Sequence, residues 1–325
     1  MTGSLRIPPT IAALVSVALA AGCSGRASEQ STPADTGKPA VQAAATPGTM
    51  PESWSPPAVD STPDDPYEVA VYRGLALLTH TRDSLPRFVG GNLNCTSCHL
   101  DEGRRPNAAP LTGVFARYPR YIDRAAAVIP IEDRVNYCFT RSLAGSKLPN
   151  GSREMQDIVA YLSYISRDVP VGSHVSGEGM PKMPSLTGDS ASGHALFTEN
   201  CVRCHGADGA GIGPVPALWG PKSFSIGASM ARPERAASFI RHNMPFDKPG
   251  TLTDQQSFDI ASYITAMARP DMPGKAQDWP EGGAPADTPY DTPGHKATRP
   301  VQLLPRHGDP KAAIVDAPPS VLRAR

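Results

Sequence analysis

The stretch Asn94-Cys95-Thr96-Ser97-Cys98-His99 decides how this chain folds, and Cys201-Val202-Arg203-Cys204-His205 repeats its pattern. Each stretch reads Cys-x-x-Cys-His, which is the sequence that attaches a c-type haem. The two thiols of a motif can add to the two vinyl groups of one porphyrin, and the adjacent histidine can bind the iron as the proximal ligand. Zinc knuckles and redox dithiols are the alternatives, but they do not explain the paired histidines. The motifs therefore predict two covalently bound haem c groups, attached through Cys95, Cys98, Cys201 and Cys204, with His99 and His205 on the iron.

Length and composition fit two small haem-centred domains. The chain has 325 residues, which favours two domains rather than one. Lysine plus arginine and aspartate plus glutamate both number 31, so the charge balance gives no reason to expect a nucleic-acid partner. Aromatic residues are few and prolines number 36. A haem suits such domains because its apolar face replaces part of the core that about a hundred residues struggle to build alone.

The N-terminus carries an export signal. Residues 1–22 contain Arg6 and an apolar run over 11–21, which is shorter than the ~20 residues that span a bilayer, so a signal peptide is the better interpretation. The sequence up to Cys23 also resembles a bacterial lipobox, although Ala20 stands where a leucine is usual. We therefore expect a periplasmic protein, either tethered to a membrane through lipidated Cys23 or released by ordinary cleavage. Residues 23–65, rich in Ala, Pro, Ser and Thr, are expected to form a flexible tether.

The rest of the chain contains an internal repeat of about a hundred residues. Its order of helix, haem motif, proline turn, distal segment and closing helix is that of a class I cytochrome c, so we predict a mainly α fold with two tandem domains of this kind. The predicted boundaries are a catalytic domain over 66–170, a linker over 171–189, an electron-transfer domain over 190–271 and an irregular C-terminal arm over 272–325. Helices are expected near 67–81, 132–143, 152–165, 192–200 and 253–268.

A proline follows each proximal histidine at the same distance. Pro110 lies eleven residues after His99, and Pro216 lies eleven residues after His205. In class I cytochromes a proline carbonyl often accepts the free N–H of the proximal imidazole and so orients the ring. Pro110 is the candidate in the first domain, and Pro214 or Pro216 in the second.

The second axial ligand decides whether a haem carries electrons or performs catalysis. In the second domain Met244 lies 39 residues after His205, just before the closing helix. A methionine ligand raises the haem potential, which suits an electron exit, so Met244 is the predicted distal ligand. His242 and Met230 are the alternatives.

The same offset of 39 residues from His99 falls on Cys138, the one cysteine outside the haem motifs and the export signal. A thiolate ligand is charged and soft; it stabilises ferric iron and lowers the haem potential. The sequence therefore predicts Cys138 as the distal ligand of the first haem, whereas a small buried apolar side chain is the plainer alternative. Met155, His80 and His174 are the other possible ligands.

Arginines cluster around Cys138 in the sequence. A charge run is usually a solvated face, but guanidinium groups bind oxyanions through two hydrogen bonds, and they would also favour the thiolate form of Cys138. The group therefore suits an anionic substrate. Its members are Arg117, Arg120, Arg124, Arg134 and Arg141.

With these residues in place, the chain resembles the dihaem thiosulfate dehydrogenases, also called tetrathionate synthases, over roughly 67–290. The shared stretches are 94–100, 113–121 and, most specifically, 134–145, which holds Cys138. In that family the cysteine of this block is the distal ligand of the active-site haem and can act covalently. The resemblance implies that two thiosulfates are coupled to tetrathionate and that Arg134 and Arg124 bind the substrate. We expect the electrons to leave through the second haem to a soluble cytochrome.

One position beside the second haem departs from the pattern of some family members. Some members carry a lysine beside the methionine of the second haem, proposed to exchange with it as a ligand. Asn243 stands there in this chain, so we expect plain ligation by His205 and Met244.

The residues also leave alternative functions open. These are a non-catalytic electron-transfer cytochrome, a dihaem peroxidase, and tetrathionate reduction at the same site.

Overall fold

The computed structural model describes residues 48–59, 64–299 and 301–305. The predicted signal peptide, Cys23 and most of the tether lie outside the described residues, as does the end of the C-terminal arm. Within the described ranges, no helix is both long enough and apolar enough to cross a membrane.

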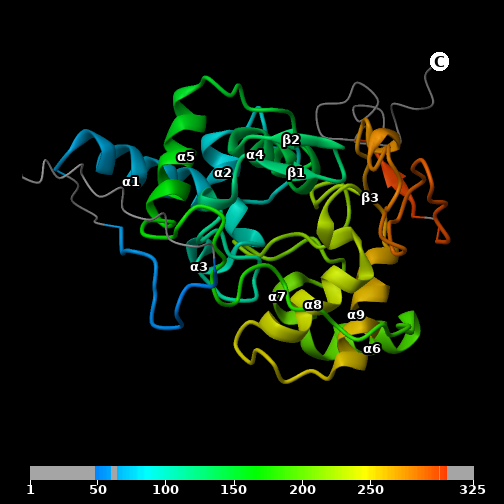
Figure 1. Cartoon of the computed structure of the whole chain (residues 1–325). Helices are drawn as coiled ribbons and strands as arrows, with labels where there is room; N and C mark the ends of the chain where they lie inside the picture. The colour runs from blue at the N-terminus through cyan, green and yellow to red at the C-terminus, as the bar shows by residue number, and fades with distance from the viewer. Residues whose placement is uncertain (1–47, 60–63, 300, 306–325) are drawn as a thin grey trace, which may run out of the picture. The chain divides into compact units, whose positions relative to one another are not determined.

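One group of helices surrounds the first haem motif (Figure 1). Asp65 caps the first of them by accepting hydrogen bonds from the backbone N–H groups of Tyr67 and Glu68. The closing helix starts after Ser152, whose hydroxyl accepts the N–H of Met155 at 3.2 Å, as the sequence predicts. The helices of this group are α1 (Pro66–Thr79), α2 (Thr81–Ser84), α4 (Ile131–Tyr137) and α5 (Arg153–Tyr164).

The chain between these helices forms short irregular elements. A two-stranded antiparallel hairpin, which the sequence pattern did not predict, pairs Arg120 with Ile129. Helix α4 passes directly into a wider π-helical turn that begins at Cys138, and such turns are often found at functional sites. The short elements are η1 (Cys95–Ser97), α3 (Leu100–Gly103), η2 (Phe115–Arg117), β1 (Arg120–Ile122), β2 (Ala127–Ile129) and η3 (Cys138–Ser142).

A second group of helices surrounds the second haem motif (Figure 1). The capping box predicted at the closing helix is confirmed: the Thr253 hydroxyl accepts the N–H of Gln256, and the Gln256 side chain accepts the N–H of Thr253. The sequence did not predict the helix that leads to Met244. The elements here are α6 (Ser190–Asn200), α7 (Val202–His205), η4 (Ser229–Ala231), α8 (Pro233–Asn243) and α9 (Asp254–Ala266).

The two helical groups share a glycine at the crossing of their first and last helices, and this common feature supports the internal repeat. Gly74 on α1 faces α5 so closely that a Cβ there would lie 2.1 Å from the carbonyl oxygen of Asp157. Gly193 on α6 faces α9 in the same way, with 2.0 Å to the carbonyl oxygen of Asp259. Because no side chain fits at such distances, each domain needs a glycine where its first and last helices cross.

Segments that the sequence assigned to tether and arm pack against the domains. Met50 donates its N–H to the carbonyl oxygen of His174 at 2.7 Å, and Met50 and Trp54 pack against buried Val169. Because these apolar side chains pack against the first domain, residues 48–59 differ from the flexible tether that the sequence predicts over 23–65. Near the other end, β3 (Arg269–Pro270) pairs in parallel with β4 (Leu303–Leu304), and the arm between them contains η5 (Lys275–Gln277).

Candidate functional site

A cavity opens beside the first haem motif, between α1, η3 and α5. Its empty volume is about 600 Å³, including space open to solvent. Cys95, Cys98 and His99 line one part of it and Cys138 lines another. The rest of the wall is almost wholly apolar, with Leu78, Leu93, Leu111, Phe139, Leu143 and Leu162 among its residues.

The proximal histidines are oriented by backbone carbonyls. The Nδ1 atom of His205 lies 3.1 Å from the carbonyl oxygen of Pro216, as predicted. In the first domain the prediction of Pro110 is wrong by one residue, because Nδ1 of His99 lies 2.6 Å from the carbonyl oxygen of Ala109. Ala109 adopts a left-handed conformation with φ of 50°, which turns its own carbonyl to the imidazole. In both domains Nδ1 therefore carries the proton and Nε2 is free to bind iron.

Cys138 lies opposite the proximal histidine and beside Arg134. Arg134, one helical turn earlier, donates from Nη1 to the sulfur at 3.2 Å, and His99 lies close enough to Cys138 to act on it. Burial acts to raise the pKa of Cys138, but the charge of Arg134, the interaction with His99 and the hydrogen bond from Arg134 outweigh it, so the pKa falls to about 6. Burial instead raises the pKa of Cys95 and Cys98 to about 12. Cys138 is therefore the thiolate of this site.

These residues fit a covalently attached haem. The cavity offers two neutral thiols for attachment, an imidazole with Nε2 free, a thiolate facing it and apolar walls for the porphyrin. The other possible ligands are placed differently. Met155 is fully buried in the core, His80 bonds the Thr79 hydroxyl at 2.9 Å, and His174 bonds Glu178 at 2.6 Å. None of these three lines the cavity.

Arg124 and Arg141 are held together by a carboxylate from the C-terminal arm. Buried Asp278 accepts Nε of Arg124 at 2.8 Å and Nη2 of Arg141 at 2.6 Å. The Tyr290 hydroxyl donates to the same carboxylate at 2.8 Å and also bonds Arg124, whose guanidinium lies 4.6 Å from the centre of the Trp279 ring. Arg124 does not line the cavity, whereas the sequence analysis expected it to lie beside Cys138.

We expect Asp278→Asn to lower the free energy of unfolding by about 3 kcal/mol, because removing one partner leaves two buried guanidinium charges without compensation. Denaturation of the holoprotein, followed by circular dichroism, measures the loss. Asp247→Asn is the matched control, because Asp247 forms an exposed ion pair with Arg203 and such exposed pairs contribute little to stability. Equal losses in the two variants would contradict the assignment of a structural role to Asp278.

In the second domain Met244 directly follows α8 and, like Cys201, packs against the buried core cluster of this domain. Met230 packs against the same cluster and also against that of the first domain. His242 uses Nδ1 to bond the carbonyl oxygen of Ser238 at 2.8 Å. The Asn243 amide donates to the carbonyl oxygens of Asn107 and Phe239, each at 3.2 Å, so its side chain is already engaged by the backbone.

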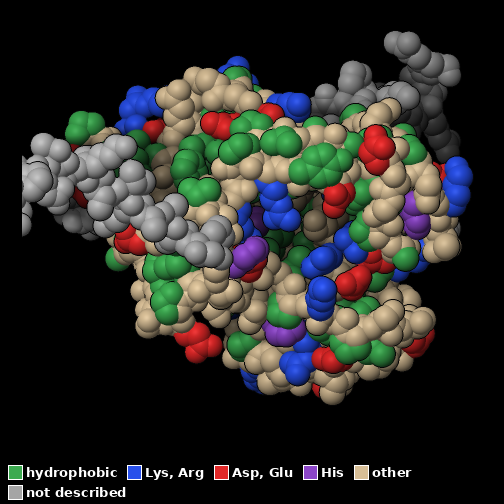
Figure 2. Space-filling view, in the orientation of Figure 1, with side chains coloured by type: hydrophobic (Ala, Val, Ile, Leu, Met, Phe, Trp, Pro, Cys, Tyr) green, Lys and Arg blue, Asp and Glu red, His purple; other side chains and the backbone are tan. Residues whose placement is uncertain are grey.

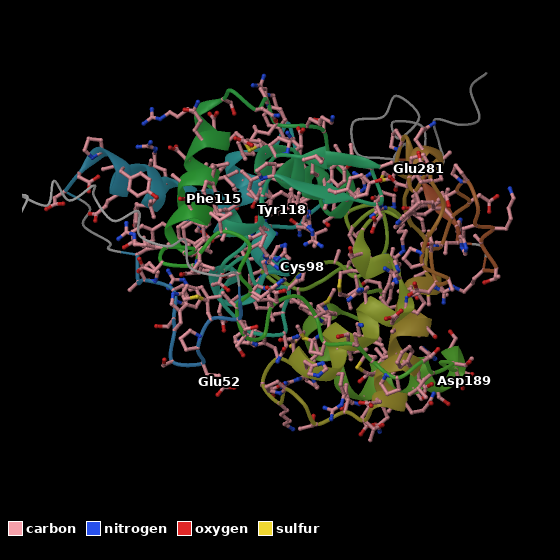
Figure 3. All side chains as sticks on the ribbon, viewed as in Figure 1. Glu52, Cys98, Phe115, Tyr118, Asp189 and Glu281 are labelled. Atoms are coloured by element: carbon pink, nitrogen blue, oxygen red, sulfur yellow. The ribbon has the colours of Figure 1, made fainter. Side chains whose placement is uncertain are left out.

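Basic side chains gather around a hollow in the middle of the face shown in Figure 2. Tyr118, which sequence reasoning did not single out, is half-buried and lies close enough to Arg134 and Cys138 to interact with both; it is labelled in Figure 3. Burial raises the pKa of Tyr118, so it stays a neutral phenol. Asp278 was missed as well, because no motif or periodicity marks it within a proline-rich arm.

Two family models match the chain in the order that the repeat predicts. The cytochrome c domain of the SoxA/TsdA family matches residues 90–171, and the general cytochrome c family matches residues 190–268. The prediction of two cytochrome c domains, mainly α, is therefore confirmed. Because each domain carries a complete attachment motif, the chain holds two covalently bound haem c groups.

Named relatives agree with these family-model matches. The thiosulfate dehydrogenase of Psychrobacter arcticus is 44% identical over 71% of this chain and 73% of its own length, and that of Allochromatium vinosum is 39% identical over 66% and 83%. The solved thiosulfate dehydrogenase TsdBA from Marichromatium purpuratum, in its as-isolated form, superposes with a TM-score of 0.68 at 30% identity. That match covers 76% of this chain and only 57% of the solved chain. The chain belongs to the thiosulfate dehydrogenase family.

Proposed function

We propose that this protein oxidises two thiosulfate ions to tetrathionate at the first haem and passes the two electrons through the second haem to an external acceptor. The observation that carries the proposal is the Cys138 thiolate, held by Arg134 at 3.2 Å on the wall of the cavity that contains the first attachment motif. An electron-transfer cytochrome would have no use for a thiolate and a guanidinium at that place. Each bound haem supplies one-electron redox chemistry, so two haems match a two-electron coupling.

The proposed reaction at Cys138 has two steps, which conserve atoms and charge. The thiolate and one thiosulfate join through a new S–S bond with loss of two electrons, giving a cysteine S-thiosulfonate with one negative charge. A second thiosulfate then attacks the sulfur bound to Cys138, which breaks the bond to the cysteine, releases tetrathionate and restores the thiolate. Arg134, and Arg124 with the orientation that Asp278 gives it, offset the charge of the anions. In this proposal Cys138 would also hold the haem iron, together with His99.

The decisive assay is ferricyanide reduction by the purified holoprotein with thiosulfate as the sole reductant and tetrathionate measured as the product. The proposal expects two ferricyanide ions reduced for each tetrathionate formed. Formation of sulfate or sulfite would overturn the coupling reaction. Faster turnover in the opposite direction, with a reduced viologen as the donor and tetrathionate as the substrate, would identify a tetrathionate reductase instead.

Ligation of the second haem by Met244 makes a separate prediction. Met244→Ala is expected to convert this haem from low spin to high spin in the ferric state, because the sixth position loses its ligand. Met230→Ala is the matched control, since Met230 packs on the same cluster and the proposal gives it no bond to iron. Electron paramagnetic resonance spectra of both variants test the prediction. A high-spin signal in Met230→Ala alone would reassign the ligand to Met230.

We infer that the protein works in the periplasm and reduces a soluble cytochrome there. The export signal and the two covalent haems support this location, and the lipobox-like sequence supports an anchor at Cys23. Cell fractionation of the native chain and of a Cys23→Ser variant tests the anchor. Membrane association of the native chain that the variant loses would support lipidation, and equal release of both from the membrane would contradict it.

A further inference from the structure

Asn243, the last residue of α8, is only 1% exposed although its side chain is a polar amide. Its Nδ2 atom donates to the carbonyl oxygen of Phe239 in the same helix. It also donates to the carbonyl oxygen of Asn107, which lies 136 residues away in the first domain. Buried polar side chains are kept where their hydrogen bonds are made. The bond to Asn107 is not needed to end a helix, so it calls for a separate explanation.

The acceptor belongs to a segment, 107–109, whose backbone conformation is unfavourable by itself. Asn107 and Ala109 have φ angles of 64° and 50°, in the left-handed region that residues other than glycine rarely adopt. Such residues persist only where their surroundings hold them. The N–H groups of both donate at 2.8 Å to the linker, to the carbonyl oxygens of Gly177 and Gly179. Asn243 holds the Asn107 carbonyl from the second domain.

The same segment orients the proximal histidine of the first haem motif. The Ala109 carbonyl oxygen lies 2.6 Å from Nδ1 of His99. A hydrogen bond from this nitrogen makes an imidazole a stronger donor to iron. A stronger axial donor stabilises ferric iron and lowers the haem potential. A displacement of segment 107–109 is therefore expected to change the potential of the first haem.

Buried apolar side chains bring the same two parts of the chain together. Leu100, which follows His99, and Ala108 form one buried cluster with Phe239 of α8. Met244 packs against this cluster. The segment after the first attachment motif and the segment that carries Met244 thus meet through apolar packing as well as through the amide of Asn243.

We propose that Asn243 is a positioning residue for the first haem, although it directly precedes the predicted ligand of the second. By holding the Asn107 carbonyl, Asn243 keeps the Ala109 carbonyl on His99 and so keeps the first-haem potential low. The second domain would thus help to set the potential at which the first haem accepts electrons. The inference rests on the proposed ligation of the first haem by His99 and not on the identity of the substrate.

The test is a redox titration of the holoprotein followed by electron paramagnetic resonance, in which each ferric haem gives its own signal. Asn243→Leu removes the amide from a side chain of about the same volume. We expect it to shift the first-haem potential upward, because His99 becomes a weaker donor. Asn243→Ala, which removes the amide without filling its place, should shift this potential in the same direction. The titration uses no substrate, so its result is independent of the thiosulfate assay.

Asn200→Leu is the matched control. Asn200 is the last residue of α6, directly precedes Cys201 of the second haem motif, and is bonded within its own helix. Its Nδ2 atom donates to the carbonyl oxygen of Leu196 at 3.0 Å, as Asn243 does to that of Phe239. Among the described residues, this amide makes no hydrogen bond to the first domain. The first-haem potential of Asn200→Leu is expected to equal that of the native protein.

Four results would overturn the proposal. An unchanged first-haem potential in both Asn243 variants would show that segment 107–109 keeps its place without the amide. A shift confined to the second haem would show that Asn243 acts only on its neighbour Met244. An equal upward shift in Asn200→Leu would show that the effect does not depend on the bond to Asn107. An equal upward shift in Met244→Ala, which keeps Asn243, would assign the effect to the loss of a ligand at the second haem.

Discussion

Replacing Cys138 with methionine is expected to abolish thiosulfate turnover and to raise the first-haem potential by roughly a few tenths of a volt, given that axial ligands set haem potentials over about 0.8 V. Methionine is neutral and keeps a sulfur donor, so the iron stays ligated while the ferric state loses its stabilising charge. The thioether also cannot form the S–S bond to thiosulfate. Loss of a covalent nucleophile lowers turnover by factors on the order of 10³ to 10⁶.

Two measurements separate the roles of Cys138. Potentiometric titration reports its effect as a ligand, and the ferricyanide assay reports its effect on turnover. Met155→Leu is the control, because Met155 is fully buried near the site and does not line the cavity. That variant should retain both the potential and the turnover of the native protein. Thiosulfate oxidation at the native rate in Cys138→Met would remove the covalent mechanism.

The placement of Cys138 shows how much a repeat in the sequence can predict. The offset of 39 residues that links His205 to Met244 also links His99 to Cys138. Local structure at the two positions differs, since Met244 follows a straight helix and Cys138 opens a π-helical turn. The spacing nevertheless points to one sulfur-bearing residue in each domain, and the structure places Cys138 on the wall of the first cavity and Met244 against the same core cluster as Cys201.

Contacts between distant parts of the chain could not be predicted in this way. Arg124 and Asp278 are 154 residues apart, and the arm that carries Asp278 has no periodic pattern. The arginine cluster therefore suggested that Arg124 lies beside Cys138, whereas the structure shows its side chain bound to Asp278 of the arm. The proline rule failed at Ala109 for a local reason, since a left-handed residue turned a different carbonyl to His99.

Arg134→Gln is expected to lower kcat/KM for thiosulfate by about 10²-fold, because the loss of one charge-assisted hydrogen bond removes about 1.5–3 kcal/mol and the anions lose their nearest cation. The expected loss has two sources. Arg134 donates to the Cys138 sulfur at 3.2 Å, and its charge favours the thiolate over the thiol. Glutamine retains an N–H donor on a shorter side chain and carries no charge.

Arg134→Lys separates charge from geometry, because lysine restores the charge without the planar fork that binds an oxyanion through two hydrogen bonds. We expect its kcat/KM to lie between those of the native protein and Arg134→Gln. Arg120→Gln provides the control, since Arg120 is an exposed residue of β1 and has the same formal charge. If Arg120→Gln and Arg134→Gln lost activity equally, the cluster would act as a diffuse positive field. A loss specific to Arg134 would place substrate binding at the thiolate itself.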